Sequence, residues 1–358
     1  MHIVKKTIFI FFTLSLIMFK IDVNADLIIC KRATSLHKEV CNATFDTSTC
    51  QADGYSNGSE IEYGSLGKDG VLTSGDAFDC DVNGDGEYDA ITERFYYISD
   101  AINGTKIDKN TAVLVYYTNV SGGKPSNSDT YPYIENGNNG NGPLTAIKQL
   151  PTTKQWITTL TNTKRQITTE TGNTFTDYTE LAKNFDYEGY AARLLTVQEV
   201  NSGCSITIGN SVQGEISTKC KYLLENTKYS NGDTKTYGEW LENPSSLYGF
   251  SWFVFSTNRN VFNNTATNNG AFGVRPVIEV AKDKIEITKK IENNEKDTEE
   301  TIDNKNEVVN VDNTMLNISK AISVIGIGIL VIGILIINKY MFTKNSSTRE
   351  EHHNGKRL

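Results

Sequence analysis

Hydrophobic and polar residues follow a strand-like pattern in several short segments of the chain. These segments are rich in aromatic and β-branched residues and are bounded by polar or turn-forming residues, which favours β-strands. They are ERFYYIS (93–99), AVLVYYT (112–118), TYGEWLEN (236–243), FSWFVFST (250–257) and FGVRPVIEV (272–280). We expect the last three to form an antiparallel meander. Pro276 should lie at a strand end, because proline has no N–H to donate within a central ladder.

Two segments carry helix signals. Residues 151–160 begin with a proline, which is favoured at the first position of a helix. Thr196 and Glu199 have the spacing of a capping box, and Gly203 is placed to end that helix in the left-handed conformation. Residues 190–195, just before the capping box, have the pattern of a strand. Two short helices beside a mostly antiparallel sheet predict an α+β fold.

The two ends of the chain predict export and membrane anchorage. Residues 1–25 combine a basic start, an apolar run and small residues near the end, as in a secretory signal peptide. An uncleaved N-terminal anchor is the alternative. Residues 321–338 are apolar and close to the minimum length for a transmembrane helix, and residues 339–358 are basic. The positive-inside rule places that basic tail in the cytoplasm. We expect a single-pass type I protein of the cell membrane with an extracellular ectodomain.

The ectodomain divides by composition into three parts. Residues 26–70 form a cysteine-rich N-terminal extension, and residues 71–281 form the main folded domain. Residues 282–320 are charged and poor in apolar residues, which predicts a flexible stalk. The formal net charge of the whole chain is −8, which argues against nucleic acid as a partner.

Cysteines and histidines limit the chemistry that the ectodomain can perform. An even number of cysteines in an exported chain predicts disulfides, with free buried thiols as the alternative. The six are Cys30, Cys41, Cys50, Cys80, Cys204 and Cys220. The last two are expected to pair, and the first four allow three pairings. His37 is the one histidine in the expected ectodomain, so a Ser-His-Asp triad has little support. We predict that the protein is not an enzyme; carboxylate-based glycan hydrolysis is the enzymatic alternative.

The segment DVNGDGEYD (81–89) has the spacing of an oxygen-rich calcium loop. Ca²⁺ takes six to eight oxygen ligands, and alternate residues of a tight loop can supply them around a glycine such as Gly86. The expected ligands are Asp81, Asn83, Asp85, Glu87 through its carbonyl, and Asp89. Thr92 stands at position twelve, where an EF-hand has a glutamate, and the loop resembles those of integrin-type repeats more closely. The alternative is a β-hairpin turned by Asn-Gly and Asp-Gly pairs.

Three motifs in fixed order carry a resemblance. The motifs, in chain order, are ARLLTVQEV, the tryptophan-bearing YGEWLEN and GVRPVIEV. Together they resemble an uncharacterised bacterial family of exported proteins, DUF6273. The same order is similar to the formylglycine-generating-enzyme branch of the C-type-lectin fold. The resemblance implies a C-type-lectin-like domain. The enzymes of that branch bind copper through cysteines in the C-terminal part of the domain. This chain has no cysteine after Cys220, so the oxidase activity does not carry over.

The asparagine-rich segment between 252 and 280 is the candidate ligand-binding face. In a C-type-lectin-like fold the irregular segment before the last strand lies at that face, and amides suit sugar hydroxyls or backbone groups. The candidate residues are Asn258, Asn260, Asn263, Asn264, Asn268 and Asn269, with Trp252 as anchor and Tyr248, Phe262 and Phe272 as apolar contacts. Some lectin-like receptors diversify such segments by adenine mutagenesis. We expect a glycan or protein ligand; an ordinary polar loop and a structural envelope protein are the alternatives.

Overall fold

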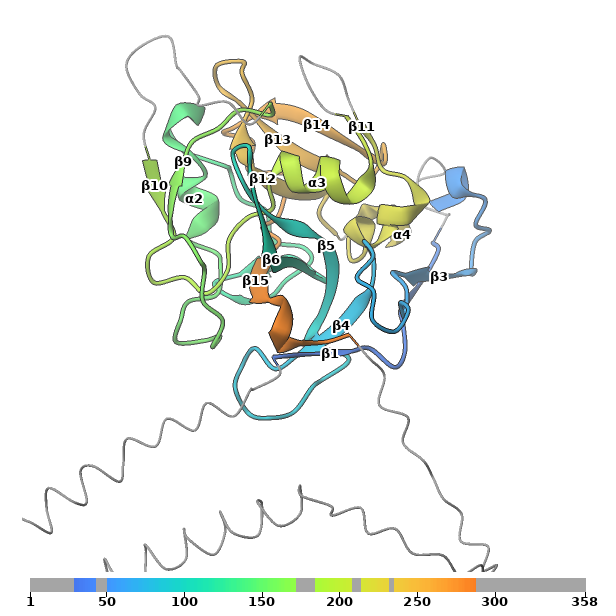
Figure 1. Ribbon diagram of the computed structural model, residues 1–358. Helices are drawn as coiled ribbons and strands as arrows, with labels where there is room; N and C mark the ends of the chain where they lie inside the picture. The colour runs from blue at the N-terminus through green and yellow to red at the C-terminus, as the bar shows by residue number, and fades with distance from the viewer. Residues whose placement is uncertain (1–28, 43–49, 172–183, 208–213, 232–234, 288–358) are drawn as a thin grey trace, which may run out of the picture. The chain divides into compact units, whose positions relative to one another are not determined.

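A six-stranded sheet forms the centre of the domain, in the order β15-β6-β5-β4-β1-β16 (Figure 1). The computed structural model describes residues 29–42, 50–171, 184–207, 214–231 and 235–287. The strands are β1 (Cys30–Arg32), β4 (Ala77–Cys80), β5 (Arg94–Asn103), β6 (Lys106–Tyr116), β15 (Val277–Ala281) and β16 (Ile285–Glu286). Every pairing is antiparallel except that of β1 with β16.

A second, four-stranded antiparallel sheet has the order β11-β14-β13-β12. Its strands are β11 (Gly214–Glu215), β12 (Gly238–Pro244), β13 (Phe250–Phe255) and β14 (Asn260–Thr265). Three two-stranded pairs complete the strands: β2 (His37–Val40) with β3 (Glu60–Tyr63), β7 (Val120–Ser121) with β8 (Lys124–Pro125), and β9 (Lys164–Gln166) with β10 (Asn184–Asp186).

Helices in the described residues are short. The α-helices are α2 (Leu144–Ile147), α3 (Val197–Cys204) and α4 (Lys228–Asn231), and the 3-10 helices are η1 (Cys50–Asp53), η2 (Asn139–Asn141), η3 (Thr218–Leu224) and η5 (Lys282–Lys284). The predicted capping box is present at the start of α3, between Thr196 and Glu199. The expected α+β class is therefore confirmed, with much more sheet than helix.

Strands β5 and β6 separate two hydrophobic clusters. Phe95, Tyr97, Leu114 and Tyr116 belong to one cluster. Their neighbours along the two strands, including Tyr96, Ile98, Val113 and Val115, belong to the other. Because side chains alternate between the faces of a strand, burial of both faces requires an unbroken apolar run. This explains why FYYI and AVLVYY lack the usual alternation with polar residues, and it places both strands at the centre of the fold.

Two predicted elements are absent from the structure. Residues 151–160 are a turn and extended chain rather than a helix, because the backbone of Ile157 bonds to Val82 and Trp156 packs on Phe95 and Tyr116. Residues 190–195 form isolated bridges, including Arg193 with Val277, and no strand. Here tertiary contacts override local propensity.

The predicted meander is also partly wrong. Strand β15 covers only the end of the segment 272–280 and pairs with β6 in the central sheet, while β14 takes the expected place beside β13. Pro276 lies immediately before β15, as predicted. Gly203 is inside α3, and Ser205 takes the left-handed conformation instead, with φ of 57°. A Cβ atom at Gly203 would lie 2.5 Å from the carbonyl oxygen of Ile98, so glycine is required there for close packing on β5.

The disulfide prediction is confirmed for all six cysteines. The pairs are Cys30–Cys80, Cys41–Cys50 and Cys204–Cys220. The first joins the adjacent strands β1 and β4, and the third joins the end of α3 to η3. Each closed loop restricts the unfolded chain and so stabilises the fold.

The chain ends give one difference. Residues 282–286, expected to begin the stalk, form η5 and β16, and Ile285 is buried opposite Cys30. The signal peptide 1–25, the stalk from 288 to 320, the apolar segment 321–338 and the basic tail 339–358 lie outside the described residues. Within the described part of the chain, no helix has the length and apolar character needed to cross a membrane.

Candidate functional site

The asparagine-rich segment is a β-strand for half of its length, not an irregular loop. Strand β14 pairs with β13 in regular register, with Asn263 opposite Trp252 and Asn264 opposite Ser251. The connecting turn is tight and contains Arg259 in the left-handed conformation, with φ of 51°. Val261, Phe262 and Thr265 give the segment enough β-propensity to pair with its apolar neighbour. Asn260, Asn263 and Asn264 are therefore held on a β-hairpin.

The structure divides the predicted ligand-binding residues into accessible and inaccessible ones. Asn258 and Asn269 are exposed, Asn263, Asn264 and Asn268 are half-buried, and Asn260 is buried. Trp252, the expected anchor, is only 1% exposed, and its indole N–H donates to Glu170 at 3.2 Å. Trp252 and Asn260 therefore pack inside the domain and cannot face a ligand in this conformation.

Three loops that are distant in sequence meet at the edge of this hairpin. The backbone N–H of Ile134 donates to the carbonyl of Ala266, and the N–H of Ala266 donates to the carbonyl of Gly249. The hydroxyl of Thr130 donates to the carbonyl of Asn269 at 2.6 Å. We define the Tyr248 surface as a set of exposed or half-buried residues on these loops and at the end of β14, namely Asn136, Leu247, Tyr248, Asn264, Thr267, Asn268 and Asn269.

Tyr248 and Leu247 are the apolar members of this surface. The exposed fraction of Tyr248 is 56% and that of Leu247 is 48%. Of the other expected apolar contacts, Phe262 is half-buried and Phe272 is buried against Trp240 and Phe253. Tyr248 is thus the predicted aromatic residue that the fold presents to solvent.

A buried amide, Asn139, holds the loop that carries Tyr248. Its side-chain nitrogen lies 3.0 Å from the carbonyl oxygen of Ser245, 2.9 Å from that of Leu247 and 2.6 Å from that of Phe250. Its side-chain oxygen accepts from the N–H of Gly249 at 3.0 Å. Asn139 has no exposed surface. A fully bonded amide beneath the loop fixes the backbone that displays two apolar side chains.

Sequence reasoning did not find Asn139 or Leu247. Asn139 lies in a run of asparagines and glycines, and its role depends on a contact with residues more than a hundred positions away. Leu247 had a weak local signal, since an apolar pair before Gly249 in the polar turn PSSLYGF has no place in a strand or helix pattern. The positive φ of Gly249, 77°, closes that turn.

The predicted calcium loop connects β4 to β5, and its side chains cap its own backbone. Asp81 is buried and accepts from the N–H groups of Gly84 at 2.8 Å and Gly86 at 3.0 Å. Asn83 accepts from the N–H of Asp85, and Asp85 accepts from the N–H of Glu87. Among the described residues, no group of three or more His, Cys, Asp or Glu side chains is placed to hold a metal ion. Calcium binding therefore stays a prediction.

Asp89, the last predicted ligand, is exposed and bonded to the residues that follow it. It accepts from the N–H of Ile91 at 2.7 Å and from the hydroxyl of Thr92 at 2.7 Å. These hydrogen bonds, that of Ile91 foremost, lower the pKa of Asp89. The carboxylate is consequently charged across the physiological range.

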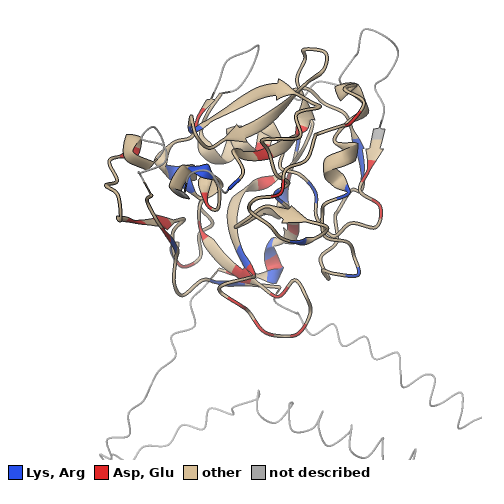
Figure 2. Cartoon of the chain, turned by 180° about the vertical axis from the view of Figure 1, so that it is seen from behind, with Lys and Arg blue, Asp and Glu red and all other residues tan. Residues whose placement is uncertain are grey.

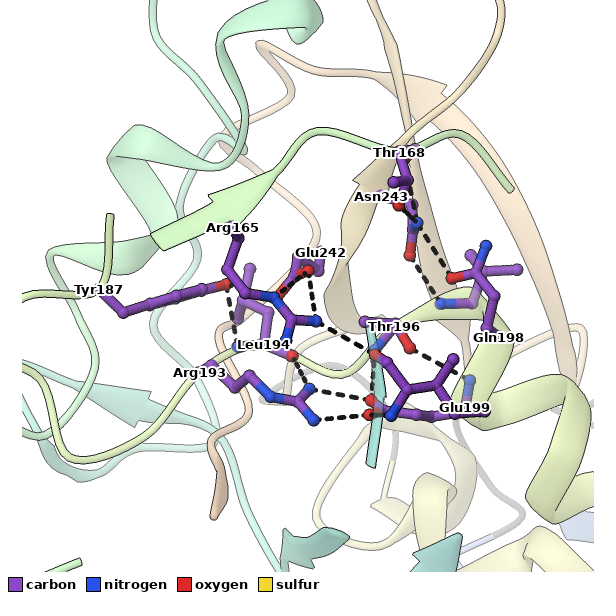
Figure 3. A network of polar contacts seen from close by, with 12 residues as sticks. Arg165, Thr168, Tyr187, Arg193, Leu194, Thr196, Gln198, Glu199, Glu242 and Asn243 are labelled. Atoms are coloured by element: carbon purple, nitrogen blue, oxygen red, sulfur yellow. Dashed lines mark hydrogen bonds and ion pairs between the residues drawn. The ribbon is translucent and has the colours of Figure 1, made fainter. Parts of the chain in front are cut away.

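The motif residues of the resemblance form a buried polar network (Figure 3). The guanidinium of Arg193 donates to both oxygens of Glu199, at 2.6 and 2.9 Å, and to Glu279 at 2.7 Å. Arg165 donates from two nitrogens to one oxygen of Glu242, at 3.1 and 3.0 Å, and the other oxygen of Glu242 accepts from Tyr187 at 3.1 Å. All of these side chains are buried and engaged with one another. Their arrangement is that of a structural network, and it joins α3 to β12 and β15.

The comparisons with known proteins place no further constraint on the site. No protein-family model, curated protein or solved structure matches this chain.

Proposed function

We propose that the protein is a non-catalytic cell-surface binding protein whose Tyr248 surface takes an external glycan or protein ligand. In this proposal the segment 321–338 anchors it in the cell membrane, with the folded domain outside. The observation that carries the proposal is the contact of Asn139 with the loop 245–250. A buried amide holds the backbone of the loop that exposes a tyrosine and a leucine.

The composition of the surface suits recognition. An exposed aromatic ring offers a large contact area with little conformational entropy to lose, and amides offer both donors and acceptors. Tyr248 supplies the ring, and Asn264 at the end of β14 and Asn268 and Asn269 on the loop that follows supply the amides. Because the loops are already fixed by backbone hydrogen bonds, less entropy is lost on binding.

The disulfides support an extracellular location. All six cysteines of the chain are paired in three disulfides. Disulfides persist in oxidising compartments and are rare in the cytosol. This agrees with the signal peptide and the membrane anchor that the sequence predicts.

The test is a binding screen of the full chain in detergent micelles against immobilised cell-surface glycans and extracellular matrix proteins. We expect saturable binding by the wild type, weakened at least about tenfold in Tyr248→Ala, as for a central aromatic anchor. Ile107→Ala is the matched control, because Ile107 is an exposed apolar residue on β6, outside the Tyr248 surface.

Three outcomes would contradict the proposal in different ways. Unchanged binding by Tyr248→Ala would place the ligand elsewhere. Absence of any saturable ligand, together with an envelope defect in cells that lack the protein, would favour the structural envelope protein. Release of sugar products from a bound glycan, measured by mass spectrometry, would show a hydrolase instead.

A further inference from the structure

Glu93, which follows the predicted calcium loop, has a buried carboxylate with an unused oxygen. Its side chain is 4% exposed. One oxygen accepts from the backbone N–H of Asp89 at 3.1 Å, so the carboxylate is turned back toward the loop. The other oxygen is buried and has no hydrogen-bond partner among the residues that the structure describes. Burying a carboxylate oxygen without a partner is costly, and such an atom requires an explanation.

The charges of the loop that ends at Glu93 are of the same sign. The thirteen residues from Asp81 to Glu93 contain five carboxylates and no lysine or arginine. Two cations are nearby: the ammonium of Lys31 lies over the ring of Tyr88, 3.7 Å from its centroid, and Arg94 donates from its Nε to Asp79 at 2.7 Å. The two Nη atoms of Arg94 are buried without a hydrogen-bond partner among the described residues.

We propose that Glu93 completes a Ca²⁺ site in this loop. The other ligands are the carboxylates of Asp81, Asp85 and Asp89, the amide oxygen of Asn83 and the backbone carbonyl of Glu87. Thr92 at position twelve cannot provide a charged ligand, and Glu93 supplies it from the next position. Six oxygen groups satisfy the coordination that Ca²⁺ requires. The carboxylates have not converged here, so the loop contracts around the ion on binding.

The site stabilises one particular end of the domain. The N–H of Asp81 donates to the carbonyl of Ile29 at 2.9 Å, and His37 bonds to the carbonyl of Ala90. The loop thereby contacts the N-terminal segment beside β1 and β16. In Figure 1 these strands and the loop lie at the bottom, while β13 and β14 lie at the top. The proposed ion would stabilise the end of the domain from which the chain continues toward the predicted membrane segment. It is independent of the Tyr248 surface.

The test is calorimetric titration of the EDTA-treated full chain with calcium chloride, in detergent micelles and with magnesium present, together with thermal unfolding. We expect one Ca²⁺ per chain and a higher melting temperature with calcium. Glu93→Gln should weaken the affinity at least about tenfold, because even outer ligand partners cost that much. Glu87→Gln is the matched control: it removes the same charge from the same loop but keeps the carbonyl ligand, so its affinity should stay within about threefold.

Asp85→Asn is a second variant, because Asp85 is exposed and its substitution spares the core. It should weaken binding as Glu93→Gln does, which keeps the test valid if the buried substitution unfolds the domain. The proposal is overturned if calcium chloride produces neither heat nor a change in melting temperature. It is equally overturned if a folded Glu93→Gln variant binds calcium as the wild type does, or, where that variant does not fold, if Asp85→Asn does so. Ligand capture by the Tyr248 surface is measured separately, so either proposal can fail alone.

Discussion

Two buried arginines, Arg193 and Arg275, are partnered in contrasting ways. Arg193 donates to the carboxylates of Glu199 and Glu279 at 2.6 to 2.9 Å. Arg275 donates instead to backbone carbonyls, at 3.3 Å for Tyr222, 3.2 Å for Leu223 and 2.5 Å for Glu225. Its nearest carboxylate, Glu239, lies 3.6 Å from its Nε atom. The Nε of Arg275 and both oxygens of Glu239 have no hydrogen-bond partner.

The difference indicates that the hydrogen bonds of a buried charge pair decide which charge state the fold favours. The charge of Arg193 is balanced by two carboxylates, and its neighbours raise its pKa well above the ordinary value after outweighing the effect of burial. At the other pair, burial raises the pKa of Glu239 to about 7, and the nearby Arg275 only partly opposes this. The carboxylates around Arg193 stabilise its charged form. The Arg275–Glu239 pair instead favours a neutral Glu239 carboxyl group near physiological pH.

Arg193→Met should have the largest effect on stability. It leaves the carboxylates of Glu199 and Glu279 buried without a cation, and we expect a loss of about 3–5 kcal/mol in the free energy of unfolding, measured with denaturant. Arg259→Met is the control, because Arg259 pairs with Asp53 in a more exposed place, and we expect about 1 kcal/mol or less. Equal losses in the two variants would show that completeness of the buried network does not matter.

Glu239→Gln should change how stability depends on pH. The folded protein holds a proton on Glu239 up to about pH 7, whereas the unfolded chain releases it near its ordinary pKa of about 4.3. The folded state therefore binds more protons over this window, so wild-type stability falls as pH rises through it. A shift of this size corresponds to about 4 kcal/mol at high pH, which the neutral glutamine does not lose.

Unfolding by urea at several pH values between about 4 and 9 measures this effect. The Glu239→Gln profile should be flatter than that of the wild type. Glu60→Gln on β3 is the control, because Glu60 is exposed and its substitution should leave the slope as it is. An unchanged slope in Glu239→Gln would mean that Arg275 fully compensates the charge of Glu239.

The sequence predicted those parts of the fold whose signals are local. The capping box of Thr196 and Glu199 depends on four consecutive positions, and β5 and β6 depend on runs of apolar residues; the structure has all three. The failures at 151–160 and 190–195 have one physical cause, since both segments take their conformation from partners distant in sequence.

The same distinction applies to the candidate site. Tyr248 was recognisable as an aromatic residue in a polar turn, but the support from Asn139 depends on a contact between residues 139 and 245–250. The burial of Trp252 likewise depends on Glu170, which no local pattern connects to it. Residue chemistry could be predicted from the sequence, whereas accessibility required the fold.

Substitution of His37 should have the smallest effect on stability. In its hydrogen bonding, His37 is intermediate between Arg193 and Arg275. Its Nδ1 atom lies 2.7 Å from Glu225, and its Nε2 atom contacts the carbonyl of Ala90, so both nitrogens face acceptors. Neutral imidazole can donate from only one nitrogen, whereas imidazolium donates from both. Burial opposes protonation, but the hydrogen bond and charge of Glu225 outweigh it and raise the pKa of His37.

Because that pKa is raised, the stability contributed by His37 should be complete below its unfolded pKa of about 6.5 and lost as pH rises through the folded value. We expect His37→Gln to cost on the order of 1 kcal/mol near pH 5.5 and clearly less near pH 8.5, by urea unfolding. Lys38→Gln, at the exposed next position of β2, should not alter this pH dependence. If His37→Gln costs the same at both pH values, the residue acts by packing on Tyr117 rather than as a buried cation, and it resembles neither arginine.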